Sequence, residues 1–153
     1  MTVPATGATS FGRSPDGGGD FRTLAALTPG TVNASRIVPT VVLNELFYHS
    51  ISENDDEQFV ELYNPGSSGM SLRNWQLSGG VDFNFASTHS VPAGGYLVVA
   101  RNKEKFLALH TNLTATQVVG NFEGRLSHAG ERVQLKDASG VVVENVTYGT
   151  DGR

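Results

Sequence analysis

Phe59-Val60-Glu61-Leu62-Tyr63, closed by Asn64-Pro65-Gly66, is the stretch of sequence that decides the fold. Apolar and polar side chains alternate through it, and β-branched and aromatic residues are enriched, which is typical of a half-buried strand. The Asn-Pro-Gly that follows is a turn signal, because proline cannot donate to a sheet and glycine tolerates turn geometry. The sequence therefore predicts a strand over 58–63 that ends in a sharp turn.

Similar runs lie on both sides of this strand. They cover residues 41–48, 96–100, 130–136 and 141–148, and turn-forming residues separate them. In the first run we expect Val41, Leu43 and Phe47 to share one face. Short strands with turn signals about every ten residues are typical of a sandwich or a barrel. The sequence predicts an all-β sandwich.

A further pair of apolar runs straddles Gly79-Gly80. One holds Trp75 and Leu77, and the other continues to Phe83 and Phe85. Two glycines between alternating runs indicate a hairpin with a two-residue turn. We expect Trp75 to fill the core of the sandwich, because its large ring gains most from burial.

One short helix is predicted near residues 102–109. Asn102 is a favoured N-cap residue, and Phe106 and Leu109 form an apolar pair at a spacing of three. No other segment carries a helical pattern of comparable clarity.

The composition of the chain excludes several classes of protein. It has 153 residues, 39% of them hydrophobic, no cysteine and a net charge of −4. The absence of cysteine excludes a disulfide scaffold and a thiol nucleophile, and the negative charge argues against non-specific nucleic-acid binding. No apolar run is long enough for a membrane span. We expect no signal peptide in this chain, because Met1-Thr2-Val3-Pro4 begins neither a basic nor an apolar region.

Residues 1–38 differ from the remainder of the chain. Turn signals such as Ser14-Pro15-Asp16-Gly17 and Thr28-Pro29-Gly30 separate only scattered apolar residues. This segment is too poor in apolar residues to build a core. We expect an N-terminal extension or linker over 1–38 and one domain over 39–153.

The segments of this domain, in order, resemble the lamin tail domain family. The residues that carry the resemblance are Leu43-Asn44-Glu45-Leu46, Phe59 to Gly66, Leu72-Arg73-Asn74-Trp75-Gln76-Leu77, Val91-Pro92-Ala93-Gly94-Gly95-Tyr96-Leu97, Gly130-Glu131-Arg132-Val133 and Val146-Thr147-Tyr148-Gly149. The resemblance implies an immunoglobulin-like β-sandwich without a shared catalytic site. It also implies the bacterial type, found mostly in large exported multidomain proteins, because no heptad rod is present.

The extension is similar to the trailing end of such a domain. Ser10 to Gly17 and Thr28 to Asn33 resemble residues that normally follow the last strand, yet here they precede the domain. Two interpretations stay open. The chain is a window cut from tandem copies, or residues 10–34 occupy, on this domain or on a neighbour, the place of a missing tail.

The strongest anomaly in composition is an acidic loop, residues 52–57. Six carboxylates and no Lys or Arg lie between residues 45 and 61, so the rest of the chain is net positive. Clustered oxygen ligands are what Ca²⁺ requires. Glu53, Asp55, Asp56 and Glu57 are the candidate ligands of a calcium site, although their spacing matches no EF-hand. The alternative is a solvated acidic loop.

Glu45 and Glu61 lie at matching places in two strands that we expect to pair. If they face each other, they need a donor, because like charges opposite one another repel. We expect a buried carboxylate network in which Arg73 or Arg132 supplies that donor.

Three functions are open at this point. The first is a non-catalytic module of a larger exported protein, secreted or on the cell surface. It would bind proteins, cell-surface polysaccharide or neighbouring lamin tail domains, or act as a spacer. The second is a module that binds calcium or glycan through the 52–57 loop or an exposed aromatic face. The third, an enzyme, is disfavoured: His49, His89, His110 and His128 lack metal-ligand spacing, and no nucleophile motif is present.

Overall fold

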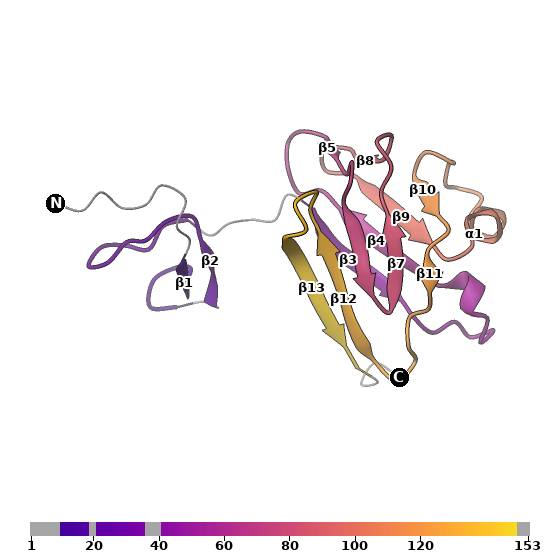
Figure 1. The fold of residues 1–153 in the computed structure, drawn as a ribbon, viewed down its shortest axis with the longest axis horizontal. Helices are drawn as coiled ribbons and strands as arrows, with labels where there is room; N and C mark the ends of the chain where they lie inside the picture. Colours follow the sequence, from indigo (N-terminus) through magenta and orange to yellow (C-terminus); the bar gives the residue numbers. More distant parts are fainter. Residues whose placement is uncertain (1–9, 19–20, 36–40, 150–153) are drawn as a thin grey trace. The chain divides into compact units, whose positions relative to one another are not determined.

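The computed structural model describes residues 10–18, 21–35 and 41–149. The chain divides into two compact units, Met1–Val38 and Pro39–Arg153. In the first unit, β1 (Ser10–Arg13) and β2 (Phe21–Leu24) form an antiparallel hairpin (Figure 1). Leu24 is only 1% exposed. Its Cδ1 lies 2.8 Å from the place that a β-carbon on Gly12 would take, so the close approach of the two strands requires a small residue there.

One sheet of the second unit has four strands in the order β10-β9-β4-β3. These are β3 (Val42–Phe47), β4 (Phe59–Tyr63), β9 (Tyr96–Ala100) and β10 (Val118–Gly120). The first three pair antiparallel, and β10 runs parallel to β9. A parallel pair needs a crossover connection. Here α1 (Lys103–Leu109) provides it.

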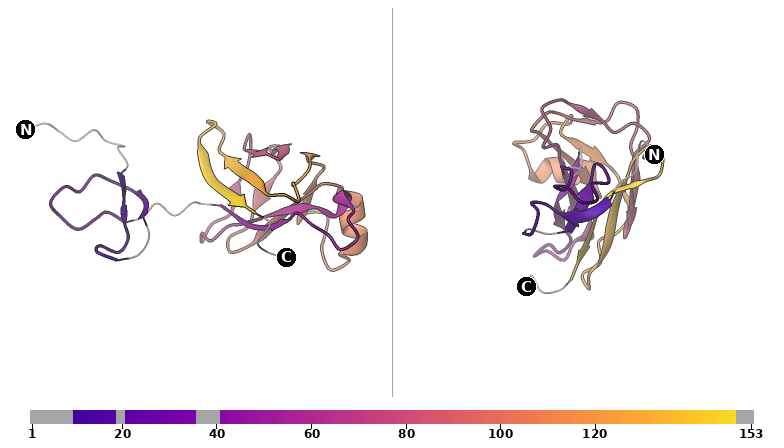
Figure 2. Two further views of the ribbon diagram at one scale, coloured as in Figure 1. Left: turned by 90° about the horizontal axis from the view of Figure 1, so that it is seen from below. Right: turned by 90° about the vertical axis from the view of Figure 1, so that its left-hand side faces the viewer.

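The second sheet has five strands in the order β11-β7-β6-β12-β13. They are β6 (Gln76–Gly79), β7 (Val81–Asn84), β11 (Glu123–Gly124), β12 (Glu131–Lys136) and β13 (Val142–Tyr148). A two-stranded ribbon of β5 (Met70–Ser71) and β8 (Ser90–Val91) adds to the unit. Figures 1 and 2 show the two sheets as two layers, with α1 on the side away from β13. The predicted all-β sandwich is confirmed.

The core lies between the two layers. Val60 and Leu62 of β4 are fully buried, as are Val133 and Leu135 of β12. Alternate residues of a strand face opposite sides, so each strand contributes every second side chain. The core also contains Leu72, Trp75, Leu77, Val81, Phe83, Phe85, Val91, Leu97, Val99, Val119, Phe122 and Leu126. The prediction that Trp75 fills the core is confirmed, with 9% of its surface exposed.

The prediction for the face of Phe47 is wrong. Val41 is buried and Leu43 packs on the core. Phe47, however, pairs with Phe59 on the outer face, where their rings lie 5.3 Å apart. The register of β3 against β4 shifts between Leu43 and Glu45. This bulge adds one residue to the strand, which reverses the alternation beyond it.

The hairpin and the helix each differ from prediction in one detail. The register Leu77↔Phe83 leaves residues 78–82 between the last paired positions, so the hairpin is real but has no two-residue turn. Asn102 caps α1 as expected, accepting from Lys105 N at 3.1 Å. Phe106 is buried but Leu109 is 58% exposed. His110 stacks on Phe106 at 4.2 Å instead, because the helix ends before a second apolar turn forms.

Candidate functional site

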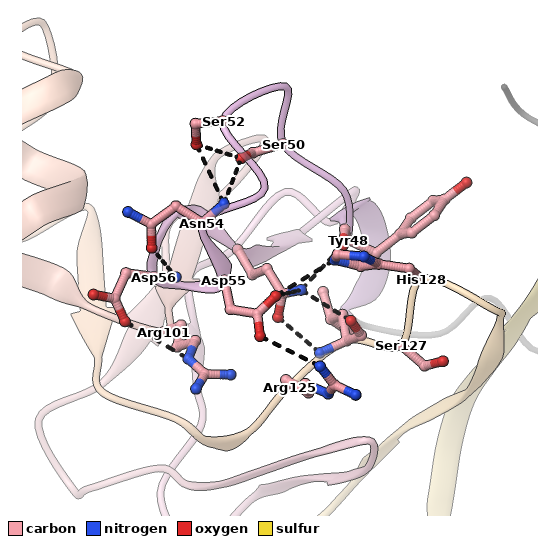
Figure 3. Close-up of polar contacts among 12 residues, drawn as sticks. Tyr48, Ser50, Ser52, Asn54, Asp55, Asp56, Arg101, Arg125, Ser127 and His128 are labelled. Carbon is pink, nitrogen blue, oxygen red and sulfur yellow. Dashed lines mark hydrogen bonds and ion pairs between the residues drawn. The ribbon is translucent and has the colours of Figure 1, made fainter.

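The acidic loop joins β3 to β4 and is held in shape by its own polar side chains (Figure 3). Asn54 caps a short 3₁₀ helix, η1 (Asp55–Glu57), by accepting from Asp56 N at 3.1 Å. The hydroxyls of Ser50 and Ser52 lie 2.7 Å apart, and each accepts from Asn54 N at 3.3 Å. Ser and Asn satisfy local backbone groups in this way because their side chains are short. These hydrogen bonds therefore give the acidic loop a defined conformation.

Gln58, at the start of β4, ties this loop to a distant segment. It is 1% exposed. Its Nε2 donates to Leu126 O at 2.9 Å and to Tyr48 O at 3.0 Å, and its Oε1 accepts from Leu126 N at 2.8 Å. A side-chain amide has the same donor and acceptor as a peptide group. Gln58 thus pairs with the backbone of Leu126 as a neighbouring strand would.

Asp55 and Asp56 face basic side chains. Asp55 lies 3.6 Å from Arg125 Nη1 and 3.4 Å from His128 Nε2, and it accepts from Gln58 Nε2 at 3.2 Å (Figure 3). Asp56 lies 3.8 Å from Arg101 Nε and 3.8 Å from Lys105 Nζ. These groups come from the α1 region and from the segment after β11. The loop is therefore bound to its surroundings by charge as well as by hydrogen bonds.

The other two candidate calcium ligands lie apart from these pairs. Hydrogen bonds from Ser52 and then Ser50 hold the pKa of Glu57 below its ordinary value. Glu53 is exposed and its backbone is left-handed, with φ of 53°. Within residues 10–18, 21–35 and 41–149, no group of three or more His, Cys, Asp or Glu side chains is placed to hold a metal ion. The calcium hypothesis for Glu53, Asp55, Asp56 and Glu57 stays a prediction.

Glu45 and Glu61 do face each other, as cross-strand partners in β3 and β4. The network that we expected is not there: Glu45 is exposed and Glu61 is half-buried. The donor is Asn44, whose Nδ2 lies 2.8 Å from Glu61 Oε1. Asn44 reaches this place because the bulge in β3 lies beside it. In the described part of the chain, neither Arg73 nor Arg132 is recorded in contact with this pair.

Ser127 and His128 are adjacent but act separately. Ser127 Oγ accepts from Ala129 N at 3.1 Å, whereas His128 faces Asp55. Tyr148, at the end of β13, donates to Ser127 O at 3.0 Å and to Glu131 Oε1 at 2.9 Å. Burial, followed by the hydrogen bond to Glu131, raises the pKa of the Tyr148 phenol well above its ordinary value. These contacts hold strand ends together and bring no nucleophile to a base.

Comparison with known proteins agrees with this architecture. A model of the Lamin Tail Domain family matches residues 35–150. No curated protein matches the chain. Among the described residues, no helix is long and apolar enough to cross a membrane. Domains of the matched family are immunoglobulin-like sandwiches and are generally non-catalytic. The match covers most of the chain and both sheets, and the chain therefore belongs to the lamin tail domain family.

Proposed function

We propose that this chain is a non-catalytic interaction module of a larger, exported bacterial protein. It binds a partner through a preformed surface or acts as a spacer, and the partner is another protein. The family membership supports a module without catalysis. A single observation carries the choice of a protein partner: part of the outer face of the four-stranded sheet carries a pair of tyrosines, one half-buried and one exposed, next to a pair of carboxylates.

This surface, the Tyr–Glu face, consists of Tyr63, Tyr96, Glu45 and Glu61. Tyr63 and Tyr96 are cross-strand partners whose ring centroids lie 4.9 Å apart, and Tyr96 is 50% exposed. Farther along β9, Val98 and Ala100 are buried against Phe106 of α1. The helix therefore covers the part of the outer face around Val98 and Ala100, whereas Tyr96 and Glu45 of the Tyr–Glu face are exposed.

The chemistry of this face suits a basic side chain. Two carboxylates directly opposite each other repel, and the only hydrogen-bond donor recorded for them in the described residues is the neutral amide of Asn44. A lysine or arginine of a partner would neutralise the pair. Tyrosine rings next to it would add cation–π attraction of about 0.5–1 kcal/mol at an exposed site. Such a contact is aromatic and charged, as energetically dominant residues in protein interfaces are.

The test is a titration of the ¹⁵N-labelled chain with the peptide acetyl-Gly-Arg-Gly-Arg-Gly-amide, followed by NMR. We expect saturable shifts at the Tyr–Glu face, which are absent with the matched Gly-Glu-Gly-Glu-Gly peptide. A variant with Glu45→Gln and Glu61→Gln should lose them, whereas Asp137→Asn, in the turn before β13, should keep them. Equal shifts at every acidic site would contradict the proposal.

The first unit supports a further proposal, that neighbouring lamin tail domains are among the partners. Phe11 and Phe21 stack at 5.7 Å and are 69% and 51% exposed, with Arg13 placed 4.8 Å from the Phe21 ring centroid. An isolated two-stranded hairpin is marginally stable in water. A neighbouring domain that covers these rings in the parent protein would supply the missing burial.

Deleting residues 1–36 tests this. If a neighbouring domain covers the hairpin, the melting temperature of the remaining domain should not change. A lowered melting temperature would show instead that this domain itself supports the hairpin. Export is tested separately, by adding protease to intact cells: the parent protein should be cleaved without lysis, and full protection would contradict a surface or secreted location.

A further inference from the structure

A concavity of about 410 Å³ lies next to the parallel pair of the four-stranded sheet, and we call it the β8–β10 crevice. Two core side chains, Leu97 of β9 and Val119 of β10, contribute to its lining and are 1% and 7% exposed. The other side chains at its wall are mainly polar and come from the turn before β8 and its first residue, the start of α1 and the loop before β10. Because Leu97 and Val119 are almost fully buried, the polar side chains provide most of the surface that a ligand could contact.

The polar groups of the crevice are donors. Lys103 Nζ donates to Ala115 O at 3.1 Å. An ammonium group has three N–H bonds, so two remain for a ligand. His89 Nδ1 accepts from Ala86 N at 3.2 Å, which leaves Nε2–H as the donor of the neutral ring. Burial, and then the charge of Lys103, lowers the pKa of His89, so the ring is neutral at pH 7.

Three hydroxyls complete the wall, on Thr88, Ser90 and Thr116. Among the described residues, no carboxylate lines the crevice, although the chain as a whole has a net charge of −4. Thr116 Oγ1 lies 2.9 Å from the hydroxyl of Thr114, so part of this wall is already ordered. A cation and several hydroxyls match a ligand that has one negative charge and several hydroxyls.

We propose that the β8–β10 crevice binds an acidic sugar unit, with its carboxylate on Lys103 and its hydroxyls on the threonine and serine side chains. This binding is independent of the Tyr–Glu face, because different side chains form the two surfaces. The module would then bind acidic polysaccharide in addition to its protein partner.

The test is an NMR titration of the full ¹⁵N-labelled chain with sodium glucuronate, and with glucose and inorganic phosphate as separate arms. We expect saturable shifts at His89, Ser90, Lys103 and Thr116 with glucuronate at millimolar concentration. Glucose and phosphate should each bind about tenfold more weakly, because each lacks one half of the recognised chemistry. Phosphate binding as tight as that of glucuronate would overturn the assignment to a sugar acid.

Two variants separate the site from general charge effects. Lys103→Gln should weaken glucuronate binding about tenfold while its amide keeps a donor near Ala115 O. Lys105→Gln removes a cation from the same helix but outside the crevice lining, and should leave binding unchanged. Equal affinity in the Lys103→Gln and Lys105→Gln variants, or no saturable shift with glucuronate, would overturn the proposal. Neither result bears on the Tyr–Glu face, whose shifts are read from other residues.

Discussion

The side chain of Gln58 pairs with the backbone of Leu126 through two hydrogen bonds, of 2.9 and 2.8 Å, across 68 residues of sequence. The same amide reaches Tyr48 O at the end of β3. One buried side chain therefore joins the start of β4 to the segment between β11 and β12. The amide therefore fixes one end of the acidic loop to this distant segment by buried hydrogen bonds.

Replacing Gln58 should destabilise the domain strongly. The Gln58→Leu variant keeps the size of the side chain but leaves the N–H and C=O of Leu126 without their partner. Each buried unsatisfied group costs about 1–3 kcal/mol, so we expect a loss of about 3 kcal/mol in the free energy of unfolding, measured by urea denaturation. Gln134→Leu, on a half-exposed position of β12, is the matched control and should change it by less than about 0.5 kcal/mol. Similar effects of the two variants would contradict this role of Gln58.

Trp75 should stabilise the domain mainly because its large ring fills space in the core. Trp75→Ala removes a 9% exposed ring from the core, and truncations of this kind cost about 3–5 kcal/mol. Leu109→Ala serves as the control, because Leu109 is 58% exposed on the last turn of α1. Chemical denaturation of both variants measures the difference. A change within about 0.5 kcal/mol for Trp75→Ala would show that the ring is not part of the packed core.

Calcium binding at the acidic loop is tested by thermal melts in EDTA and in millimolar Ca²⁺, with Mg²⁺ as a control. We expect no calcium-specific shift, because Asp55 and Asp56 already face Arg125, His128, Arg101 and Lys105. A ligand that binds only the native state must raise the melting temperature. A rise with Ca²⁺ alone that the double variant Asp55→Asn, Asp56→Asn removes would support the calcium hypothesis.

The change in the free energy of unfolding at alkaline pH should depend on the ionisation of Tyr148. Burial and the bond to Glu131 raise the pKa of this phenol in the folded state. The stabilisation of the neutral phenol is therefore complete below the unfolded pKa of about 10 and is lost as pH rises through the folded value. Tyr148→Phe should be less stable than the wild type at pH 7, and the gap between them should narrow above about pH 10. Urea midpoints measured from neutral to alkaline pH check this, and parallel curves would contradict it.

Much of the fold was predictable because its signals are local. Strand-like runs with turn signals between them predicted the run 130–136, which contains β12, and its alternate residues Val133 and Leu135 are fully buried. Asn102 marked the start of α1, since an N-cap acts on the amide groups immediately after it. Apolar residues such as Leu43 and Leu62 pack on the core in a registered pair. Patterns of this kind need no knowledge of which strands become neighbours.

The candidate surfaces were only partly predictable. The excess of acidic residues in the 52–57 loop was plain, but its basic partners were missed because they lie far away in sequence, Arg101 before α1 and Arg125 after β11. The facing of Glu45 and Glu61 was anticipated, whereas Asn44 as their donor was not, because it depends on a bulge that no local pattern encodes. Lys103 and His89 come from separate elements, α1 and the turn before β8, which meet only in the tertiary structure.

The amino-acid sequence by itself determined the class of fold, the family, the position of most strands and the cap of α1, because periodicity, turn residues and caps act over a few neighbouring positions. The tertiary structure alone decided the reversal of faces in β3, the pairing of Gln58 with Leu126, and the side chains that meet Asp55 and Asp56. These features depend on strand register and on a crossover between segments remote in the chain, where a shift of one residue turns every side chain beyond it to the opposite face.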